Sequence, residues 1–410
     1  MNILYLTQKF PYPLTDGGNI RSFYMLKALT QQHNVTLLSG IADPRIARNC
    51  GELSLLCKQM NIFPVIPSKA KTLYSLGRGW VGRQPYFMYN NYSANVKAAV
   101  QREMDRRKAN GSNYYQAVHF NHIDVTRYLD CVPDGVAAVL DTHNAMSVMF
   151  QRLAQAERQL SKRWYLKRQE KNARRLEAET LPRMGVCLAC SAEDARQLQS
   201  LAPEARIEVI PNGVDTRLKV LPENTEAANP PELVFVGALD YLPNGQGIID
   251  FCRDVFPLIK QQIPEIRLNI IGRNPGPELK ALVEGRKINL LGEIIDVRQH
   301  LKPQQIMVVP LKLGGGTRLK ILEAMSLGLP IVSTTLGAEG LELEPEKHLL
   351  IGDDPQTMSR QIIRLYNDPP LRTSLAEASR KLAVEKYDWQ IIGRKLLEVY
   401  KQLISDTSSG

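Results

Sequence analysis

The stretch that decides the fold lies between residues 308 and 325 and reads Val308-Val309-Pro310-Leu311-Lys312-Leu313-Gly314-Gly315-Gly316-Thr317-Arg318-Leu319-Lys320-Ile321-Leu322-Glu323-Ala324-Met325. Its apolar strand pattern ends at Pro310, three glycines follow, and a helical pattern begins near Thr317. Another apolar run, from Leu329 to Thr334, comes directly after the helical pattern. Strand, helix and strand in this order predict a βαβ unit of a parallel sheet.

The start of the predicted helix is suited to binding an anion. A glycine-rich turn exposes backbone N–H groups there, and the helix dipole adds a partial positive charge. Arg318 and Lys320 add full positive charges in the first turn, where the dipole by itself favours acidic side chains. Glu323 follows about one and a half turns later, within reach of a sugar hydroxyl attached to the bound phosphate. We therefore predict a phosphate or diphosphate site; a plain turn with surface cations is the alternative.

Length and composition favour a globular protein of two domains. The chain has 410 residues, which is longer than a domain with a single hydrophobic core usually is. It is 44% hydrophobic and 23% charged, as is typical of a globular protein. The first residues, Met1 to Leu6, form a strand pattern rather than a signal peptide, and no run is long and apolar enough to span a bilayer. These features predict a cytoplasmic protein.

Two of the six cysteines, Cys187 and Cys190, form a CxxC pair. The pair lies within an apolar run that is typical of a buried strand, and no second Cys or His pair stands at metal-site spacing. We expect buried free thiols here and no metal site.

The net charge of +10 is partly concentrated between Arg158 and Arg175, a helical pattern with one acidic residue. Trp164 and Tyr165 stand at its middle. A basic helix with aromatic residues predicts a contact with an anionic membrane surface, which for a cytoplasmic protein is the inner membrane face. A solvated face with the aromatic rings packed inward is the alternative. Nucleic acid is disfavoured as a partner because no recognition motif accompanies the charge.

Short apolar runs alternate with helical patterns along the whole chain, which predicts parallel sheets covered by helices. The first series of predicted strands is 3–7, 35–39, 117–120, 137–141, 186–190 and 207–210, and the second is 233–236, 268–271, 288–290, 306–310 and 331–333. A polar, proline-bearing stretch at 220–231 separates the two series. We predict an α/β protein with two Rossmann-like domains that face each other across a cleft. The N-terminal domain covers 1–212, the C-terminal domain covers 213–385, and a last helix covers 386–405.

Gly17 and Gly18 open the first predicted helix, which runs through Leu29. A glycine pair at a helix start is a second place where the backbone can approach a ligand closely, although a plain turn explains it as well.

These motifs, taken in order, resemble those of the GT-B retaining glycosyltransferases of family 4, also called group 1 glycosyltransferases. The resemblance covers nearly the whole chain, and it includes Asp16 to Arg21, Asp141 to Asn144, Ser191 to Asp194, Ile210 to Asp215, Phe235 to Gly237, Ile271 to Arg273, Leu291 to Glu293, and the glycine-rich segment through Met325. It implies the GT-B fold, with a C-terminal helix that crosses back onto the first domain.

The resemblance also implies an activity. A nucleotide-sugar donor would bind mainly to the C-terminal domain, and a glycan or lipid-linked acceptor mainly to the N-terminal domain, as in the synthesis of surface polysaccharides. No cofactor and no metal would take part, because side chains and helix termini stabilise the departing diphosphate.

The resemblance assigns roles to particular residues. Arg318 and Lys320 would neutralise the leaving group, Glu323 would accept hydrogen bonds from the donor ribose, and His122, just after a strand, would act near the donor sugar or in acceptor protonation. The other donor-binding residues would be Gly17, Gly18, Gly237, Gly272, Arg273, Gly292, Glu293, Ile294, Gly314, Gly315, Gly316, Thr317 and Leu319. The acceptor-side residues would be Arg21, His143 and Asn144. His119, within the strand, is expected to be a satisfied structural residue.

The chain departs from the family pattern at two places. Gly315 stands where the family has the first glutamate of a pair, and Ala238 and Asn244 stand in a region where the family often carries Arg and Lys. Two other functions stay open, the first because of these departures and the second because that enzyme class shares the two-domain form. One is a catalytically silent nucleotide-sugar-binding scaffold, and the other is a nucleotide-sugar 2-epimerase, which would need acid and base carboxylates.

Overall fold

The computed structural model describes residues 1–47, 50–65, 68–217, 230–294, 296–314 and 318–408. Two compact units make up the chain: Met1–Pro211 together with Ile392–Gly410, and Asn212–Ile391. The predicted separating stretch at 220–231 lies almost entirely outside the described residues.

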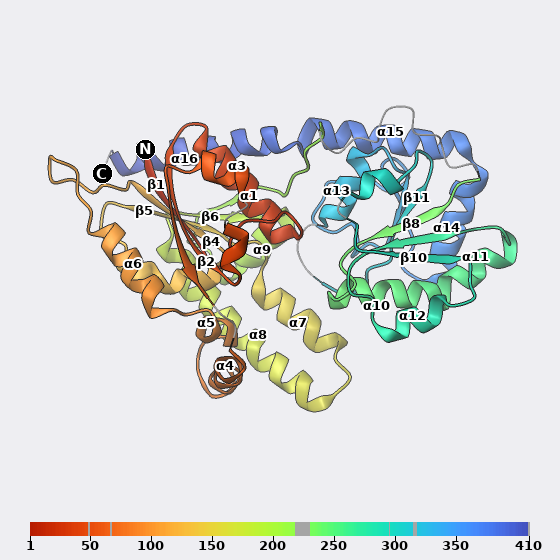
Figure 1. The fold of residues 1–410 in the computed structure, drawn as a ribbon, viewed down its shortest axis with the longest axis horizontal. Coiled ribbons are helices and arrows are strands. Elements are labelled where there is room, and N and C mark those ends of the chain that lie inside the picture. The colour runs from red at the N-terminus through yellow and green to blue at the C-terminus, as the bar shows by residue number, and fades with distance from the viewer. Residues whose placement is uncertain (48–49, 66–67, 218–229, 295, 315–317, 409–410) are drawn as a thin grey trace. The chain divides into compact units, whose positions relative to one another are not determined.

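The first unit is built on a seven-stranded parallel sheet in the order β3-β2-β1-β4-β5-β6-β7 (Figure 1). Its strands are β1 (Asn2–Thr7), β2 (Asn34–Ile41), β3 (Gln59–Pro64), β4 (Ala117–Asn121), β5 (Ala137–Asp141), β6 (Val186–Ala189) and β7 (Ile207–Val209). Its α-helices are α1 (Gly17–Thr30), α2 (Pro44–Ala47), α3 (Gly51–Leu56), α4 (Lys69–Val81), α5 (Tyr86–Asn90), α6 (Ala94–Met104), α7 (Met146–Ala156), α8 (Leu160–Thr180) and α9 (Ala192–Leu201). Two 3₁₀ segments complete it, η1 (Ile123–Cys131) and η2 (Leu181–Arg183).

The second unit is built on a six-stranded parallel sheet in the order β10-β9-β8-β11-β12-β13. Its strands are β8 (Leu233–Val236), β9 (Leu268–Ile271), β10 (Ile288–Gly292), β11 (Ile306–Val309), β12 (Ile331–Ser333) and β13 (Leu350–Ile351). Its helical segments are α10 (Leu242–Asp250), the π-helical turn η3 (Phe251–Val255), α11 (Phe256–Gln262), α12 (Pro277–Val283), the 3₁₀ segment η4 (Val297–His300), α13 (Leu319–Ser326), α14 (Pro355–Asn367) and α15 (Pro369–Lys386). The last helix, α16 (Trp389–Ser408), begins in this unit and belongs to the first unit from Ile392 onward.

Hydrophobic burial explains why these short runs become strands. Val118, Phe120, Val139 and Leu140 are all fully buried, as expected for parallel strands covered by helices on both faces. The main core of the first unit lies between its sheet and α6 to α9, and the second unit has two cores, one with α11 and α14 and one with α13.

Both sheets place their first strand next to their fourth rather than at an edge. In the first unit the chain order reverses between β1 and β4, and in the second between β8 and β11. Open parallel sheets bind ligands at the carboxyl ends of the strands on either side of such a switch point. The loops after β1, β4, β8 and β11 therefore lie where this kind of fold forms a site.

The cysteines are unpaired, and Cys187 and Cys190 are buried. Burial raises the pKa of each of these two thiols to about 12. The prediction of buried, unreactive thiols is confirmed.

Candidate functional site

The glycine corner after β11 leads into α13 at the switch point of the second sheet. Gly314 has a φ of 107°, a left-handed conformation that favours glycine, while Gly315, Gly316 and Thr317 lie outside the described residues. Arg318 is the N-cap of α13, which begins at Leu319 rather than at Thr317 as predicted. The side chain of Arg318 is buried, with one guanidinium nitrogen 3.4 Å from the Leu313 carbonyl oxygen. Its charge is thus held against the backbone of the corner.

Lys320 reaches from the first turn of α13 to the end of β8. Its Nζ donates a hydrogen bond to Asn244 Oδ1 at 2.7 Å and lies 4.3 Å from the centre of the Phe235 ring. A Cβ atom on Gly237 would lie 2.7 Å from this Nζ, so a larger residue there would displace the ammonium group from this position. Both cations thus start from the N-terminus of α13: Arg318 lies against the glycine corner, and Lys320 extends to the end of β8 on the other side of the switch point.

The environment of Lys320 disfavours its charge in the absence of an anion. Burial, and then the charge of Arg318, lower the pKa of Lys320 to about 7, while Glu323 acts in the opposite direction. A bound anion would favour the protonated form again, because a negative neighbour raises the pKa of an ammonium group. This arrangement can take up a proton together with a phosphate ligand.

The remaining predicted residues of this unit lie around the same strand ends but do not all reach the cations. Gly272 follows β9, Gly292 ends β10, Glu293 is exposed, and Ile294 packs against a core. Arg273 Nε lies 3.4 Å from Asp240 Oδ2, so a carboxylate already engages this guanidinium. The structure therefore brings Gly237, Gly314, Arg318 and Lys320 together, with Glu323 close enough to act on Lys320 electrostatically.

The first unit places its predicted residues at the ends of β1, β4 and β5. Gly17 is the first residue of α1, whose N-cap is Asp16, and Gly18 lies over His143. Arg21 is 1% exposed, and its guanidinium makes a two-pronged ion pair with Asp141, with Nε and Nη2 at 2.8 to 2.9 Å from the carboxylate oxygens. The expectation that Arg21 contacts an acceptor is therefore corrected: the side chain is enclosed and holds the end of β5.

A hydrogen-bond network fixes the tautomer of His143. Asn121 donates from Nδ2 to Thr7 and Ser22, so its Oδ1 is an acceptor, and it receives the Tyr5 hydroxyl. His143 Nε2 lies 2.9 Å from the same Oδ1 and must carry a proton to bond there. Burial lowers the pKa of His143 to about 4, although Asp141 acts in the opposite direction. At neutral pH His143 is thus an uncharged ring that presents its Nδ1 lone pair towards Gly18.

The surroundings of His122 shift its pKa in the opposite direction. It follows β4 with a φ of 86°, and its Nδ1 lies 3.0 Å from Asp124 Oδ1. Burial by itself would lower its pKa, but the charge and hydrogen bond of Asp124 outweigh this and raise the pKa of His122 above its ordinary value. Asn91 donates to the other oxygen of Asp124 at 2.7 Å and holds the carboxylate in place.

The two histidines stand side by side with different chemistry. Their ring centres are 5.7 Å apart and nearly perpendicular, and their side chains are 26% exposed for His122 and 12% exposed for His143. Neighbouring groups whose surroundings push their pKa values apart are suited to serve as proton donor and proton acceptor. Asn144 is half-buried beside them, while His119 is buried with its Nδ1 2.8 Å from the Tyr400 hydroxyl of α16, as expected for a structural residue.

Two family profiles together match most of the chain. Residues 15–218 match the profile described as Glycosyltransferase Family 4, and residues 230–368 match the one described as Glycosyl transferases group 1. The chain belongs to the group 1 glycosyltransferases of family 4 type.

The relatives of this family 4 member are distant. The phosphatidyl-myo-inositol mannosyltransferase of Mycobacterium leprae (strain TN) is 25% identical over 222 residues, which are 52% of this chain and 57% of that protein. The chain spans about half the length of the curated relatives it matches.

Solved structures share the architecture over nearly the whole chain. Sucrose-phosphate synthase from Thermosynechococcus elongatus has a TM-score of 0.70 at 17% identity and covers 99% of this chain and 100% of its own. Anabaena HepE in complex with UDP and glucose has a TM-score of 0.68 at 14% identity, covering 98% and 100%. Identities this low show the fold alone, which is the two-domain α/β GT-B fold.

The placement of Lys320 bears on one departure from the family 4 pattern. The loop after β8, where the family often carries Arg and Lys, holds Ala238 and Asn244 in this chain. The ammonium group of Lys320 reaches Asn244 from α13, so a cation is present at this loop although the loop encodes none. The other departure, Gly315, lies outside the described residues.

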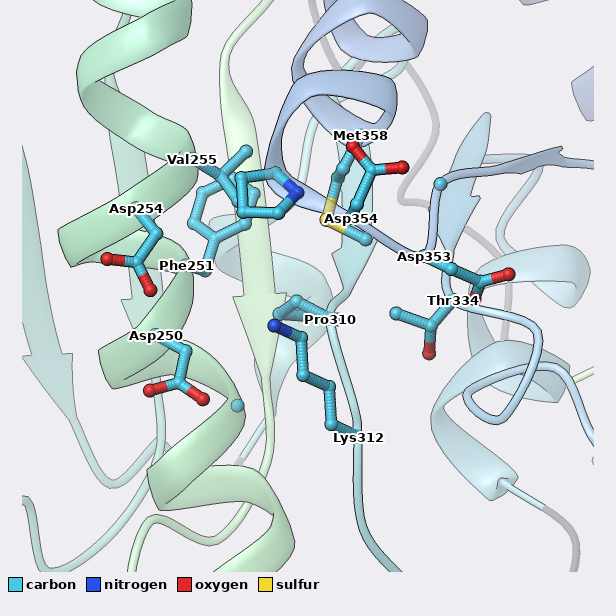
Figure 2. Close-up of a pocket in the computed structure, with 13 residues that line it drawn as sticks. Asp250, Phe251, Asp254, Val255, Pro310, Lys312, Thr334, Asp353, Asp354 and Met358 are labelled. Carbon is cyan, nitrogen blue, oxygen red and sulfur yellow. The ribbon is translucent and has the colours of Figure 1, made fainter.

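A small cavity in the second unit is not part of this site. It opens between α10, η3 and the start of α14, with Lys312, Asp250 and Thr334 at its wall (Figure 2). Its volume of about 10 Å³ is room for roughly one water molecule. Nearby, Asp353 binds Thr335, and Asp354 caps α14. None of the cations at the glycine corner lines it, so we do not assign the donor to this cavity.

Two features are absent from the described residues. No group of three or more His, Cys, Asp or Glu side chains among them is arranged to hold a metal ion. No helix in the described ranges combines the length and the apolar content that crossing a membrane requires.

The charge states of His122 and His143 give a direct prediction. In an NMR titration of the ring C–H signals, His122 should titrate above pH 6.5, whereas His143 should stay neutral to below about pH 5. Because the pKa of His122 is raised, its stabilisation of the fold is present below pH 6.5 and is lost as the pH rises through its folded value.

Asp124→Asn removes the cause of the shift and should lower the pKa of His122, with the His143 signal little changed. Asp105→Asn, at the exposed C-cap of α6, is the matched control. A His122 ring that titrates at or below pH 6.5 in the unchanged protein would contradict the assignment.

Proposed function

We propose that this protein is a retaining glycosyltransferase that moves a sugar from a nucleoside diphosphate sugar to a hydroxyl of a glycan or lipid-linked acceptor. The observation that supports the proposal is the placement of Arg318 at the glycine corner and of Lys320 at the end of β8, on the two sides of the switch point of the second sheet. Cations held in a protected corner stabilise the charge that develops on a leaving diphosphate. A metal ion is then not required for this step.

The reaction breaks the bond between the donor C1 atom and the diphosphate oxygen and forms a bond from C1 to the acceptor oxygen on the same face. The acceptor hydroxyl proton passes to the departing diphosphate. Protonated Lys320 and Arg318 hold that diphosphate, and Glu323 binds the ribose. In the first unit, the Nδ1 of His143 and the ring of His122 are suited to bind sugar hydroxyls. The configuration at C1 is retained in this scheme because the acceptor oxygen bonds to C1 on the same face that the diphosphate leaves.

The donor and acceptor classes are part of the proposal. A curated relative is named for phosphatidyl-myo-inositol, and structural neighbours hold UDP, UDP with glucose, or UDP-glucose. We therefore propose a hexose donor, an acceptor in the assembly of surface polysaccharide or glycolipid, and peripheral action at the inner face of the cytoplasmic membrane.

The test pairs turnover with ligand binding. Purified protein with EDTA should release nucleoside diphosphate from UDP-glucose or GDP-mannose, faster with an acceptor, and the product should keep the donor's anomeric configuration by NMR. Glu323→Gln should weaken UDP or GDP binding about tenfold or more but leave inorganic pyrophosphate binding unchanged, because pyrophosphate has no ribose. Glu377→Gln, at an exposed position of α15, is the control.

Two outcomes would replace the proposal. Nucleotide-sugar binding without turnover across a range of acceptors would indicate a silent scaffold. Conversion of the free nucleotide sugar to its C2 epimer would indicate an epimerase.

A further inference from the structure

A group of exposed apolar side chains lies on α4 and α8 of the first unit. These helices contact each other and project together below the seven-stranded sheet in Figure 1. The exposed residues are Leu73 (73%), Tyr74 (62%), Trp80 (38%), Val81 (71%), Leu160 (76%) and Trp164 (66%), and we call them the aromatic patch. Trp80 joins the two helices, with its ring 4.8 Å from Trp164 and 5.8 Å from Tyr165.

Helical spacing places the patch residues on neighbouring faces. Leu73 and Tyr74 precede Trp80 and Val81 by seven residues, which is two turns, so the four share one side of α4. Leu160 and Trp164 are four residues apart on α8 and also share a side. The opposite side of α4 is the one that packs, through buried Ser75 and Gly79.

Buried polar contacts hold α4 against α8. Gln169 Nε2 and Asn172 Nδ2 both donate to the Gly79 carbonyl oxygen at 2.9 Å, and Gln169 Oε1 accepts the Tyr86 N–H. Arg168 donates to the carbonyl oxygens of Trp80 and Gly82. The patch is therefore fixed in place, and its exposure does not come from an undocked helix.

The surroundings of the patch are positive. No acidic residue occurs between Glu52 and Glu103, a stretch that includes all of α4, and α8 has none before Glu170. Exposed cations stand close to the patch along both helices: Lys69, Arg78, Lys162 and Lys167. Lys167 follows Trp164 by three residues, so it lies on the same side of α8.

We propose that the aromatic patch docks on an anionic lipid bilayer. Indole and phenol rings favour the headgroup level of a membrane, aliphatic side chains insert just below it, and lysines meet the acidic headgroups. A protein partner is less suited, because the core of a protein interface is depleted in lysine. The proposal extends the sequence prediction for 158–175 by adding α4, which carries most of the apolar surface, and it does not depend on sugar transfer.

Flotation with vesicles tests the proposal. The full chain should float with phosphatidylcholine vesicles that contain phosphatidylglycerol, should stay behind with pure phosphatidylcholine, and should be released by high salt. Leu73→Ser/Trp164→Ser should weaken binding at least tenfold, and Lys162→Gln/Lys167→Gln should do so by about tenfold or more.

The choice of variants follows from the contacts. Arg163 and Arg168 stay unchanged because both donate to backbone carbonyl oxygens, and their loss would disturb the fold. Leu55→Ser removes an equally exposed leucine on α3, and Lys395→Gln/Lys401→Gln removes the same charge from α16. Neither control should change flotation.

Tryptophan fluorescence gives a second measurement. Two of the three tryptophans, Trp80 and Trp164, belong to the patch, whereas Trp389 is 6% exposed. Lipids brominated on the acyl chain should quench the emission of the bound protein, and Trp164→Phe should remove most of the quenching. Flotation that the patch variants leave unchanged would overturn the proposal. A second result would also overturn the proposal: the unchanged protein does not bind vesicles but self-associates on gel filtration, and the patch variants abolish that self-association. The patch would then bind a second copy of this chain.

Discussion

Lys320→Met is expected to lower nucleotide-sugar turnover by about 10² to 10³-fold while the protein stays folded. Methionine has nearly the length of lysine and fills the space beside Phe235 and Gly237, but it carries no positive charge to bind a diphosphate. Removal of one group that stabilises a developing negative charge typically lowers the rate by about this factor. Of the two cations, Lys320 is the one that extends from α13 to the end of β8. Steady-state release of nucleoside diphosphate is the measurement.

The same variant should stabilise the ligand-free protein at neutral pH. The pKa of Lys320 is lowered to about 7 in the fold, and an unfolded lysine titrates near 10.4. Between these values the unfolded chain binds more protons, so the free energy of unfolding of the unchanged protein rises with pH in this window. Lys320→Met should lack that rise. Thermal melting at pH 7 and pH 9 without ligand compares the two proteins.

Lys312→Met is the control for charge and position. Lys312 follows the same strand, β11, but is exposed and lies by the small cavity rather than at the corner. Its loss should leave turnover within a few-fold of the unchanged protein. If Lys320→Met kept turnover within about tenfold, or lost stability at pH 7, Lys320 would be a packing residue and not a ligand of the diphosphate.

The strands could be predicted where burial is complete. Leu233–Val236 and Leu268–Ile271 have the bounds that the sequence indicates, because a strand buried on both faces is a mainly apolar run. Both runs are followed by glycine, and Asn269 is the one polar residue in them. β3 (Gln59–Pro64) was not predicted, since an edge strand that is half exposed needs no such run. β13 has two residues and is too short to carry a pattern.

The site could be predicted only in its local part. The glycine corner and its cations are neighbours in sequence, so their proximity follows from the chain itself. The contact between Lys320 and Asn244 joins residues 76 positions apart, and that between Arg21 and Asp141 joins residues 120 positions apart. Neither separation leaves a local signal. The family resemblance placed Arg21 on the acceptor side, and the sequence does not reveal its buried partner Asp141.

The pKa shifts of the two histidines, His122 and His143, could not be predicted from the sequence either. Their positions after β4 and β5 follow from the strand pattern, but their charge states depend on partners that only the fold reveals. The partner of His122, Asp124, is only two residues away. Asn121 makes one hydrogen bond to His143 and is itself held by three others, to Tyr5, Thr7 and Ser22 of β1 and α1. Sequence therefore indicates which groups are present at a switch point, and the structure decides which proton each one holds.

Asp141→Asn is expected to destabilise the protein by about 3 to 5 kcal/mol, the usual cost of leaving one partner of a buried ion pair alone. Asp141 is fully buried, and Arg21 is 1% exposed. Burial by itself would raise the pKa of Asp141, but the charge of Arg21 outweighs it and holds that pKa below its ordinary value. The pair therefore stabilises the fold above about pH 3.9 and ceases to do so as the pH falls through the lower folded value.

Calorimetry of the full chain measures the loss, which should appear as a melting temperature lower by roughly 6 to 20 °C. Asp134→Asn, at an exposed position before β5, should change stability by no more than about 0.5 kcal/mol. Arg21→Met/Asp141→Leu should recover most of the stability, since packed apolar groups replace a buried pair at little cost. A single variant that costs less than about 1 kcal/mol would show that the charge of Arg21 is compensated without Asp141, which would contradict the stabilising role assigned to the pair. The carboxylate of Asp141 also lies 3.5 Å from His143 Nε2. The double variant lacks this carboxylate, so it should restore the stability of the fold but not the orientation of the His143 ring. It would thereby separate the two roles of Asp141.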